Sequence, residues 1–462
     1  MRRIVEAAVP KRKMNSTQIM MLSFFGAILV GSLLLMIPFA TAKGEQTSFL
    51  TAIFTATTSI CVTGLVVVDT FSHWSWFGQL IILILIQAGG FGIITLYSLV
   101  MMALQRKFSL RTRVLIQDYY NLSTIQGLIP FLQRVVKDVL IVEGIGAVLY
   151  SFAFIPRFGL GKGLWASIFT SISAFCNAGI DVLGPDSLIP YRPSVWINLV
   201  TMLLIVVGGL GFVVWFDVID KVKTSAKKKY PVWTFCKRLS EHTKLVLALT
   251  AFFLISGWIL VAVFEWNNPM TLGGLSVGEK LLTSLFQSVT FRTAGFATIP
   301  QEHLSSPTAL LGCLYMFVGG SPVGTAGGIK TVTIFVVFLN MFTFIRDRSE
   351  AVVFNRAVSE KLINKATAIV TFNLILTVTL TILLMQFEHV PAIAAAYEMF
   401  SATGTVGLTR GLTQTLHPVG KILVMIGMYA GRIGPISMAL AFNTRHSKKN
   451  EIQFADGRYI VG

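Results

Sequence analysis

Four short segments of the chain share one arrangement, in which small or polar residues precede a single glycine and an apolar residue follows it. The glycines are Gly64, Gly179, Gly295 and Gly407, and they lie at nearly equal intervals. Regular recurrence of one motif indicates an internally repeated fold. Glycine permits a positive φ and adds no side chain, so neighbouring carbonyl groups can turn toward a common axis. Carbonyl oxygens gathered in a ring can replace the hydration shell of a cation. The chemistry expected is cation permeation.

Each glycine and the residues directly before it form one strip of this predicted filter. The predicted filter residues are Cys61, Val62, Thr63 and Gly64; Asn177, Ala178 and Gly179; Thr293, Ala294 and Gly295; and Thr405, Val406 and Gly407.

The composition indicates the environment in which these strips lie. Of the 462 residues, 54% are hydrophobic and 13% are charged. Apolar runs of about 20 residues recur, and a helix of that length crosses roughly 30 Å of hydrocarbon. The chain is therefore predicted to be a polytopic membrane protein. The four cysteines form no CxxC pair, the six histidines show no metal-ligand spacing, and no Ser/His/Asp grouping is legible.

The basic residues indicate the orientation. The net charge is +17, and the Lys and Arg residues cluster at the N-terminus, between the repeats and near the C-terminus. Because cytoplasmic loops carry an excess of Lys and Arg, both termini and every loop between repeats are predicted to be cytoplasmic. The orientation of the chain in the lipid membrane therefore accounts for the positive net charge, and nucleic acid is not an expected partner.

Each repeat is predicted to contain a first crossing helix, a short apolar segment ending in the glycine motif, and a second crossing helix. The first helices are expected at about 18–40, 133–155, 243–266 and 366–388; the short segments at 47–60, 163–176, 278–291 and 392–404; the second helices at 75–104, 194–222, 308–345 and 416–443. The corresponding divisions of the chain are 1–16 (N-terminus), 17–105, 132–223, 242–346 and 365–445 (repeats), and 446–462 (tail).

The short segments are expected to re-enter the membrane from the outer face. They are too short to cross, and apolar stretches of about 10 to 14 residues fit re-entrant elements. An odd number of crossings per repeat would also alternate the side of the basic loops, which does not occur. Non-helical backbone at membrane depth is tolerated only where it is buried in protein or lines a water-filled cavity. Four loops arranged around one axis satisfy this condition.

Two features of the chain carry a resemblance to a known family: the fourfold helix–re-entrant segment–helix pattern, and the sequence Gly319-Gly320-Ser321-Pro322-Val323-Gly324-Thr325-Ala326-Gly327-Gly328-Ile329-Lys330-Thr331. In both features the chain resembles the Trk/Ktr/HKT superfamily of potassium transporters, and within it the bacterial KtrB branch most. The resemblance implies an all-α polytopic membrane fold with four potassium-channel-like repeats around one central pore. It implies potassium uptake by a transporter rather than an enzyme. Among plant members, serine at the first filter position accompanies sodium transport, so Gly64 favours potassium.

The same resemblance implies further properties. The transported ion would be K⁺, with Na⁺ as a second candidate ion and as an activator, and no organic cofactor is expected in this chain. The protein would be a homodimer in the cytoplasmic membrane, resting on a cytosolic KtrA-type ring that binds ATP or ADP. Three alternatives remain open: a transporter of sodium or another monovalent cation, a secondary transporter of another substrate, and a membrane scaffold or enzyme without transport.

A second candidate site lies in the long apolar stretch 308–345, which the segment 319–328 interrupts with glycines and Pro322. A helix of that composition is unstable. The segment is expected either to kink a packed helix or to form a mobile gating loop below the filter. The predicted gate residues are Gly319, Gly320, Ser321, Gly324, Thr325, Ala326, Gly327, Gly328, Lys330 and Arg432.

Lys330 and Arg432 lie inside apolar stretches, where a charge is costly and marks function. Arg432 is expected either to donate hydrogen bonds to the loop and place a positive barrier under the pore, or to form a buried structural salt bridge. It belongs to one of the glycine clusters placed in the middle of the second helices, where close helix packing is expected.

Several other charged residues lie near the predicted filter. Asp69 and Asp181 are expected near the outer mouth, and Glu279 and Glu302 bracket the third short segment. These four carboxylates either attract cations or are ordinary solvated loop residues. Glu398 is interpreted as a hydrogen-bonded brace behind the filter. Arg292 precedes Gly295 by three residues, and by resemblance it turns into the protein, away from the axis.

Overall fold

The computed structural model describes residues 16–92, 95, 98, 127–229 and 231–434. The predicted tail 446–462, nearly all of the N-terminal segment 1–16, and the inner ends of the helices predicted at 75–104 and 416–443 lie outside the described residues.

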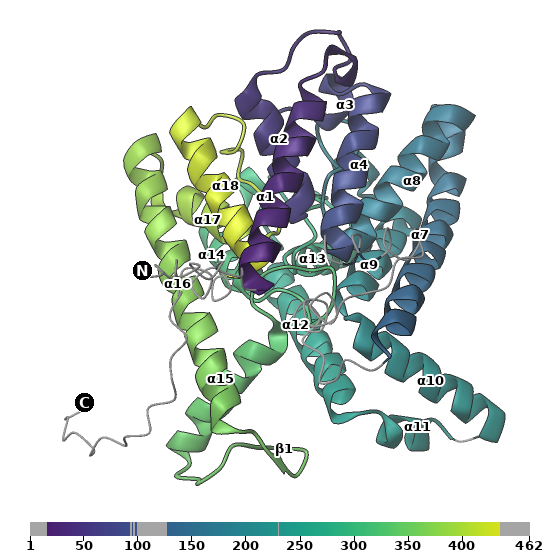
Figure 1. The fold of residues 1–462 in the computed structure, drawn as a ribbon, viewed down its shortest axis with the longest axis vertical. Coiled ribbons are helices and arrows are strands. Elements are labelled where there is room, and N and C mark those ends of the chain that lie inside the picture. Colours follow the sequence, from purple (N-terminus) through teal and green to yellow (C-terminus); the bar gives the residue numbers. More distant parts are fainter. Residues whose placement is uncertain (1–15, 93–94, 96–97, 99–126, 230, 435–462) are drawn as a thin grey trace, which may run out of the picture.

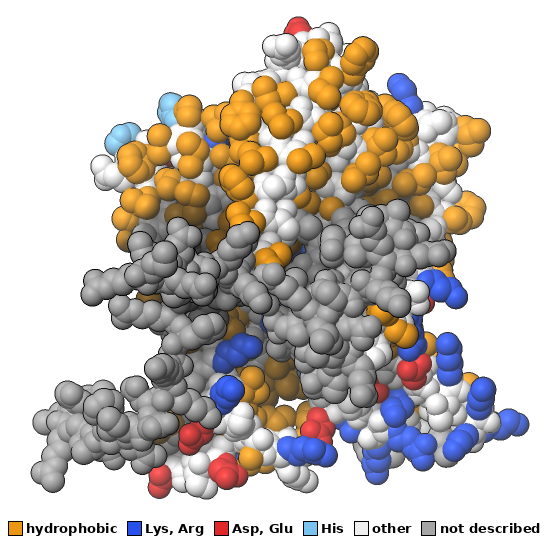
Figure 2. Space-filling view, in the orientation of Figure 1, with side chains coloured by type: hydrophobic (Ala, Val, Ile, Leu, Met, Phe, Trp, Pro, Cys, Tyr) orange, Lys and Arg blue, Asp and Glu red, His pale blue; other side chains and the backbone are white. Residues whose placement is uncertain are grey.

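The first helix of each repeat is long and apolar. These helices are α1 (Ser16–Leu35), α7 (Leu128–Phe158), α12 (Glu241–Glu265) and α16 (Glu360–Glu388). Each is long and apolar enough to cross a membrane. Figure 2 shows apolar side chains over the upper part of the molecule, and Lys and Arg side chains at its lower right. This division is the one expected of a membrane-embedded body with a basic end outside the hydrocarbon.

The short helix of each repeat packs against its own first helix. These helices are α2 (Phe49–Cys61), α8 (Leu160–Cys176), α13 (Val277–Thr290) and α17 (Ala392–Gly404). Polar caps begin two of them: Ser48 accepts a hydrogen bond from Thr51 N, and Ser276 forms a capping box with Glu279. Glu279 is thus a helix cap. The residues that follow these helices are buried, which places the strips inside the protein.

The second helices close the repeats into a ring. They are α4 (Trp76–Phe91), α9 (Val195–Gly209) with α10 (Phe212–Lys228), α14 (Ser306–Phe317) with α15 (Thr331–Ile345), and α18 (Pro418–Ile433). The second helix of each repeat contacts the short helix of the next: α4 contacts α8, α9 contacts α13, α14 contacts α17, and α18 contacts α2. The last contact returns to the first repeat, so the four repeats surround one axis. Figure 1 shows α18 of the last repeat beside α1 and α2 of the first.

The prediction of one continuous second helix over 194–222 is wrong. The helix ends at Gly209 and resumes at Phe212 after a bend of 102°. The physical reason lies in Gly211, whose φ is +88°, and in the loop of repeat 3, which inserts here. Ser321 N donates to Gly209 O at 2.9 Å, so a carbonyl that α9 leaves unpaired is bonded by another repeat.

The remaining described elements are short. They are η1 (Pro38–Ala40), α3 (Thr70–His73), η2 (Ile189–Tyr191), α11 (Val232–Arg238), η3 (Gln301–His303), β1 (Val352–Val353) and β2 (Arg356–Ala357). The two strands form an antiparallel hairpin in which Val352 pairs with Ala357. An ion pair of 2.7 Å between Arg356 and Glu241 joins this hairpin to the start of α12.

Candidate functional site

The four predicted filter strips have the same backbone conformation. In each strip both the glycine and the residue two positions before it have a positive φ, which is rare for residues other than glycine. The glycine φ values are 98° (Gly64), 65° (Gly179), 84° (Gly295) and 97° (Gly407). The preceding residues Val62, Asn177, Thr293 and Thr405 have φ values of 56°, 59°, 65° and 51°. Four segments that differ in sequence except at the glycine therefore adopt one unusual conformation, which indicates a shared structural task.

Hydroxyl groups on the short helices hold three of the strips from behind. Gly64 N donates to Thr58 Oγ1 at 3.0 Å, and Gly407 N donates to Ser401 Oγ at 3.1 Å. In repeat 2 the donor is Ile180 N, which bonds Ser173 Oγ at 3.1 Å. Because these amide groups point back to the short helices, the carbonyl groups of the strips can face the opposite side, toward the axis.

The bracing hydroxyls were not among the predicted site residues. A sequence signal for them exists, since Thr58, Ser173 and Ser401 each precede a filter glycine by six residues. Repeat 3 departs from this spacing: there Thr290 Oγ1 donates to Phe296 O at 2.7 Å.

The strips meet one another in a closed cycle. A Cβ atom built on Gly179 would lie 2.6 Å from Ala294 O, and one built on Gly295 would lie 2.6 Å from Val406 O. The same construction on Gly64 and Gly407 would strike Ala178 O and Thr63 O, also at under 3.0 Å, which real Cβ atoms essentially never show. The carbonyl directly before each glycine thus lies against the glycine of the neighbouring repeat, all the way around the ring.

An outer cavity of about 360 Å³ opens above this ring and is lined by all four filter glycines. Four carboxylates also line it, those of Asp69, Asp181, Asp186 and Glu302. Asp69 accepts hydrogen bonds from Phe71 N and Ser72 N, as a helix cap does. Burial raises the pKa of the Asp181 carboxyl to about 6, and the nearby charge of Asp69 adds to this. The outer mouth is therefore negatively charged at neutral pH.

The loop 319–328 lies on the other side of the ring and is held by repeat 2. Thr325 N donates to Gly208 O at 3.2 Å, and Thr325 Oγ1 donates to Phe175 O at 3.0 Å. Phe212 N, the first residue of α10, donates to Val323 O at 3.0 Å. The loop also touches the filter, because a Cβ built on Gly327 would clash with Thr405 Oγ1.

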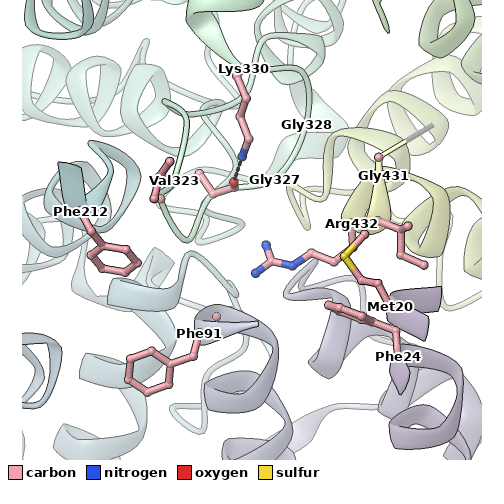
Figure 3. A pocket seen from close by; sticks show the side chains of 15 residues that line it. Met20, Phe24, Phe91, Phe212, Val323, Gly327, Gly328, Lys330, Gly431 and Arg432 are labelled. Carbon is pink, nitrogen blue, oxygen red and sulfur yellow. Dashed lines mark hydrogen bonds between the residues drawn. The ribbon is translucent and has the colours of Figure 1, made fainter. Parts of the chain in front are cut away.

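A second cavity, of about 230 Å³, lies beside this loop and holds both predicted intramembrane cations (Figure 3). Arg432 extends into it from α18, and Phe91 and Phe212 lie across from it. Lys330 Nζ donates to Ala326 O at 2.5 Å, so this ammonium group is bound within its own loop.

Arg432 joins the loop to repeat 1. One guanidinium nitrogen donates to Thr325 O at 2.7 Å, and the other donates to Gly89 O. Within the described part of the chain, Arg432 forms no ion pair, so the salt bridge considered from the sequence is absent there. The arrangement ties together the loop, α4 and α18 directly below the filter.

The glycine clusters of the second helices pack closely, as expected, but they are not in the middle of helices. Cβ atoms built on Gly89, Gly208 and Gly431 would each lie under 3.0 Å from a carbonyl oxygen near the end of a short helix, those of Ile60, Phe175 and Thr403. The helices α4, α9 and α18 end at or within two residues of these glycines. In repeat 2, where the chain beyond the cluster is described, the expected mid-helix position is wrong because the second helix bends by 102° there.

Two further predicted residues lie behind the filter. Glu398 is fully buried and accepts hydrogen bonds from Thr409 Oγ1 at 2.7 Å and from Thr413 Oγ1, so it braces the segment after strip 4. Arg292 is buried with 7% of its surface exposed, and its Nε atom has no hydrogen-bond partner among the described residues.

Comparison with known proteins shows the family and the fold of this chain. Residues 5–453 match the model of a family described as TrkH, cation transport protein. The Ktr system potassium uptake protein B of Bacillus subtilis is 37% identical over 96% of both chains. The potassium/sodium uptake protein NtpJ of Enterococcus hirae is 36% identical over 93% of both chains. The crystal structure of the potassium transporter TrkH from Vibrio parahaemolyticus superposes with a TM-score of 0.74 at 17% identity, covering 96% of this chain and 87% of that one.

Proposed function

The chain belongs to the TrkH family of cation transport proteins, and on this basis we propose that it takes up potassium ions through a pore on the axis of its four repeats. The filter is the ring of strips that ends at Gly64, Gly179, Gly295 and Gly407. The observation that carries this proposal is the closed cycle of carbonyl–glycine contacts, because such a ring places oxygens from all four repeats at one point of the axis.

Potassium is the proposed substrate for two reasons. Carbonyl oxygens without a carboxylate in the ring suit a weakly hydrated monovalent cation, which exchanges its water shell for neutral dipoles. Relatives at 36% and 37% identity are named for potassium/sodium uptake and potassium uptake. Sodium is the second candidate ion, as a competing substrate or as an activator.

The proposed path has three stages. The carboxylates of the outer cavity raise the local cation concentration. The carbonyl ring then selects the ion. Below it, the loop 319–328 and the charges of Lys330 and Arg432 close the path until the loop moves.

The location and the partners of this protein are proposed from its similarity to a protein of the Ktr system. We propose that the chain lies in the cytoplasmic membrane with both termini inside. It would act as a homodimer, and a cytosolic nucleotide-binding ring of the KtrA type, responding to ATP or ADP, would control the loop. The basic loops between repeats would supply the contact surface for this ring.

The test is ⁸⁶Rb⁺ uptake into vesicles, comparing the wild type with Gly64→Ser. The serine Cβ would strike Ala178 O, so we expect uptake and the preference for Rb⁺ over Na⁺ to fall together. Gly26→Ser is the matched control, because nothing lies within 4 Å of a Cβ at that membrane-helix position. Undiminished uptake with an unchanged ion preference in Gly64→Ser would overturn the filter assignment.

A further inference from the structure

A buried carboxyl group lies behind the filter strip of repeat 2 and takes no part in the path described above. Glu143 is in the middle of α7, and 4% of its surface is exposed. Both of its oxygens lie 3.0 Å from Nε2 of Gln87, on α4. The Cys176 thiol contacts the same carboxyl at 3.8 Å and Gln87 Oε1 at 3.7 Å. Cys176 directly precedes Asn177, where strip 2 begins.

Glu143 and Cys176 are buried, and their neighbours from three helices pack closely around them. A Cβ built on Gly90 would lie 2.5 Å from Cys176 Sγ, so α4 touches the end of α8 here. Ser171 Oγ donates to the backbone oxygen of Glu143 at 2.7 Å, which joins α7 to α8. Three helices from two repeats are thus held at one point, and a change in the carboxyl group cannot be absorbed by empty space.

No cation is paired with this carboxyl group in the described part of the chain. The titratable group that faces it is the Cys176 thiol from α8, and α4 presents the neutral amide of Gln87. The guanidinium of Arg432 donates to Gly89 O and Thr325 O instead. An ionised carboxylate at this depth without a partner is strongly disfavoured. A neutral acid avoids this cost, and its carbonyl oxygen still accepts a hydrogen bond from Gln87 Nε2.

Strip 2 also differs from the others in composition. Strips 1, 3 and 4 contain Thr63, Thr293 and Thr405, whereas strip 2 has Asn177 and Ala178 and no threonine. Strip 2 therefore lacks the threonine hydroxyl that the other three strips carry.

We propose that Glu143, as a neutral carboxylic acid, is a positioning residue for strip 2 and thereby for ion selectivity. It fixes Gln87 and the Cys176 thiol, which set the start of the strip and the end of α4. Gln87 lies two residues before Gly89, whose carbonyl receives Arg432, so the same contact steadies the group below the filter. This inference rests on the proposed function, in which strip 2 is part of the filter.

The test compares Glu143→Gln with Glu143→Leu in purified full-length protein reconstituted into vesicles. Glutamine reproduces the shape and neutrality of the protonated acid, so we expect wild-type Rb⁺ uptake and wild-type Rb⁺/Na⁺ preference. Leucine leaves Gln87 and Cys176 without their partner, and we expect the preference to fall by about tenfold, the effect of one buried hydrogen bond left unmade. Gly144→Ala is the control on the same helix, since nothing lies within 4 Å of its Cβ.

Ion preference is measured per folded protein, so a purely structural role would lower the melting temperature and leave this ratio unchanged. If Glu143→Leu fails to fold, Gln87→Leu removes the same contact from α4, and we expect the same loss of preference. A folded Glu143→Leu or Gln87→Leu protein with wild-type preference overturns the inference, as does a Glu143→Gln protein that behaves like Glu143→Leu. A wild-type protein that carries no Rb⁺ instead overturns the proposed function.

Discussion

The two hydrogen bonds of Arg432 predict how tightly the path is closed. The Arg432→Ala change removes both donors that join α18 to Thr325 O and Gly89 O. A hydrogen bond to a charged group contributes about 1.5–3 kcal/mol, so the pair contributes at least about 3 kcal/mol to the closed arrangement. Because 1.4 kcal/mol corresponds to a factor of ten, we expect the passive leak to rise about 100-fold. Ser321 N and Thr325 N still hold the loop, so the lower end of the range applies.

The assay is Rb⁺ efflux from proteoliposomes that contain this protein alone, with no regulatory subunit. Two further variants separate the hydrogen bonds from the charge. Arg432→Lys keeps the charge but cannot reach both carbonyls in a fork, whereas Arg432→Gln keeps one donor group and loses the charge. If hydrogen bonding closes the path, both variants leak at similar intermediate rates. If the positive barrier closes it, the lysine variant stays closed and the glutamine variant leaks like alanine.

A folded Arg432→Ala protein with the wild-type leak would refute this reasoning, because it would show that the loop closes without the arginine. Loss of the protein from the membrane would instead show that the hydrogen bonds of Arg432 are needed for folding. Circular dichroism and gel filtration of the purified variant distinguish these outcomes.

Three other predictions concern the filter and its surroundings. A Cβ in Gly327→Ala would clash with Thr405 Oγ1, so we expect the loop to be displaced and Rb⁺ efflux to rise severalfold. Wild-type Rb⁺ uptake should fall as the pH drops through about 6, because protonation of Asp181 removes negative charge from the outer cavity. In Asp181→Asn, uptake at low Rb⁺ concentration should be reduced, and it should not change as the pH passes through about 6. Thr58→Val removes the acceptor for Gly64 N, and Na⁺ competition against Rb⁺ uptake should show a severalfold loss of preference, whereas unchanged competition would contradict the bracing role.

Much of the fold followed from periodicity and charge. Recurrence of the glycine motif and the basic loops between repeats predicted an all-α membrane protein, and the superfamily resemblance is confirmed by the family match. Helix breaks were harder to foresee. Residues 194–222 read as one apolar run, yet the chain bends at Gly211 because the loop of repeat 3 supplies hydrogen bonds to Gly208 and Gly209. A contact between repeats decides that geometry, and local propensity does not encode it.

The candidate site shows the same limit. Gly64 and its three counterparts were found because they repeat, and Arg432 because a charge in an apolar stretch is conspicuous. The contact between Gln87 and Glu143 joins residues 56 positions apart, and nothing in either local sequence points to the other. Which carbonyl faces which glycine likewise depends on the order of the repeats around the axis, which only the folded chain defines.

The order of the repeats around the axis determines where a mutation in the filter can be compensated. A side chain introduced at Gly64 meets Ala178 O, and one introduced at Gly179 meets Ala294 O. Relief of such a clash has to come from the neighbouring repeat, more than a hundred residues away along the chain. Second-site suppressors of a filter lesion should therefore map one repeat onward, and those of a lesion at Gly407 should return to the strip at Thr63. Although the four strips belong to one chain, a mutation in one strip is compensated by the strip next to it in the ring and not by the residues next to it in the sequence.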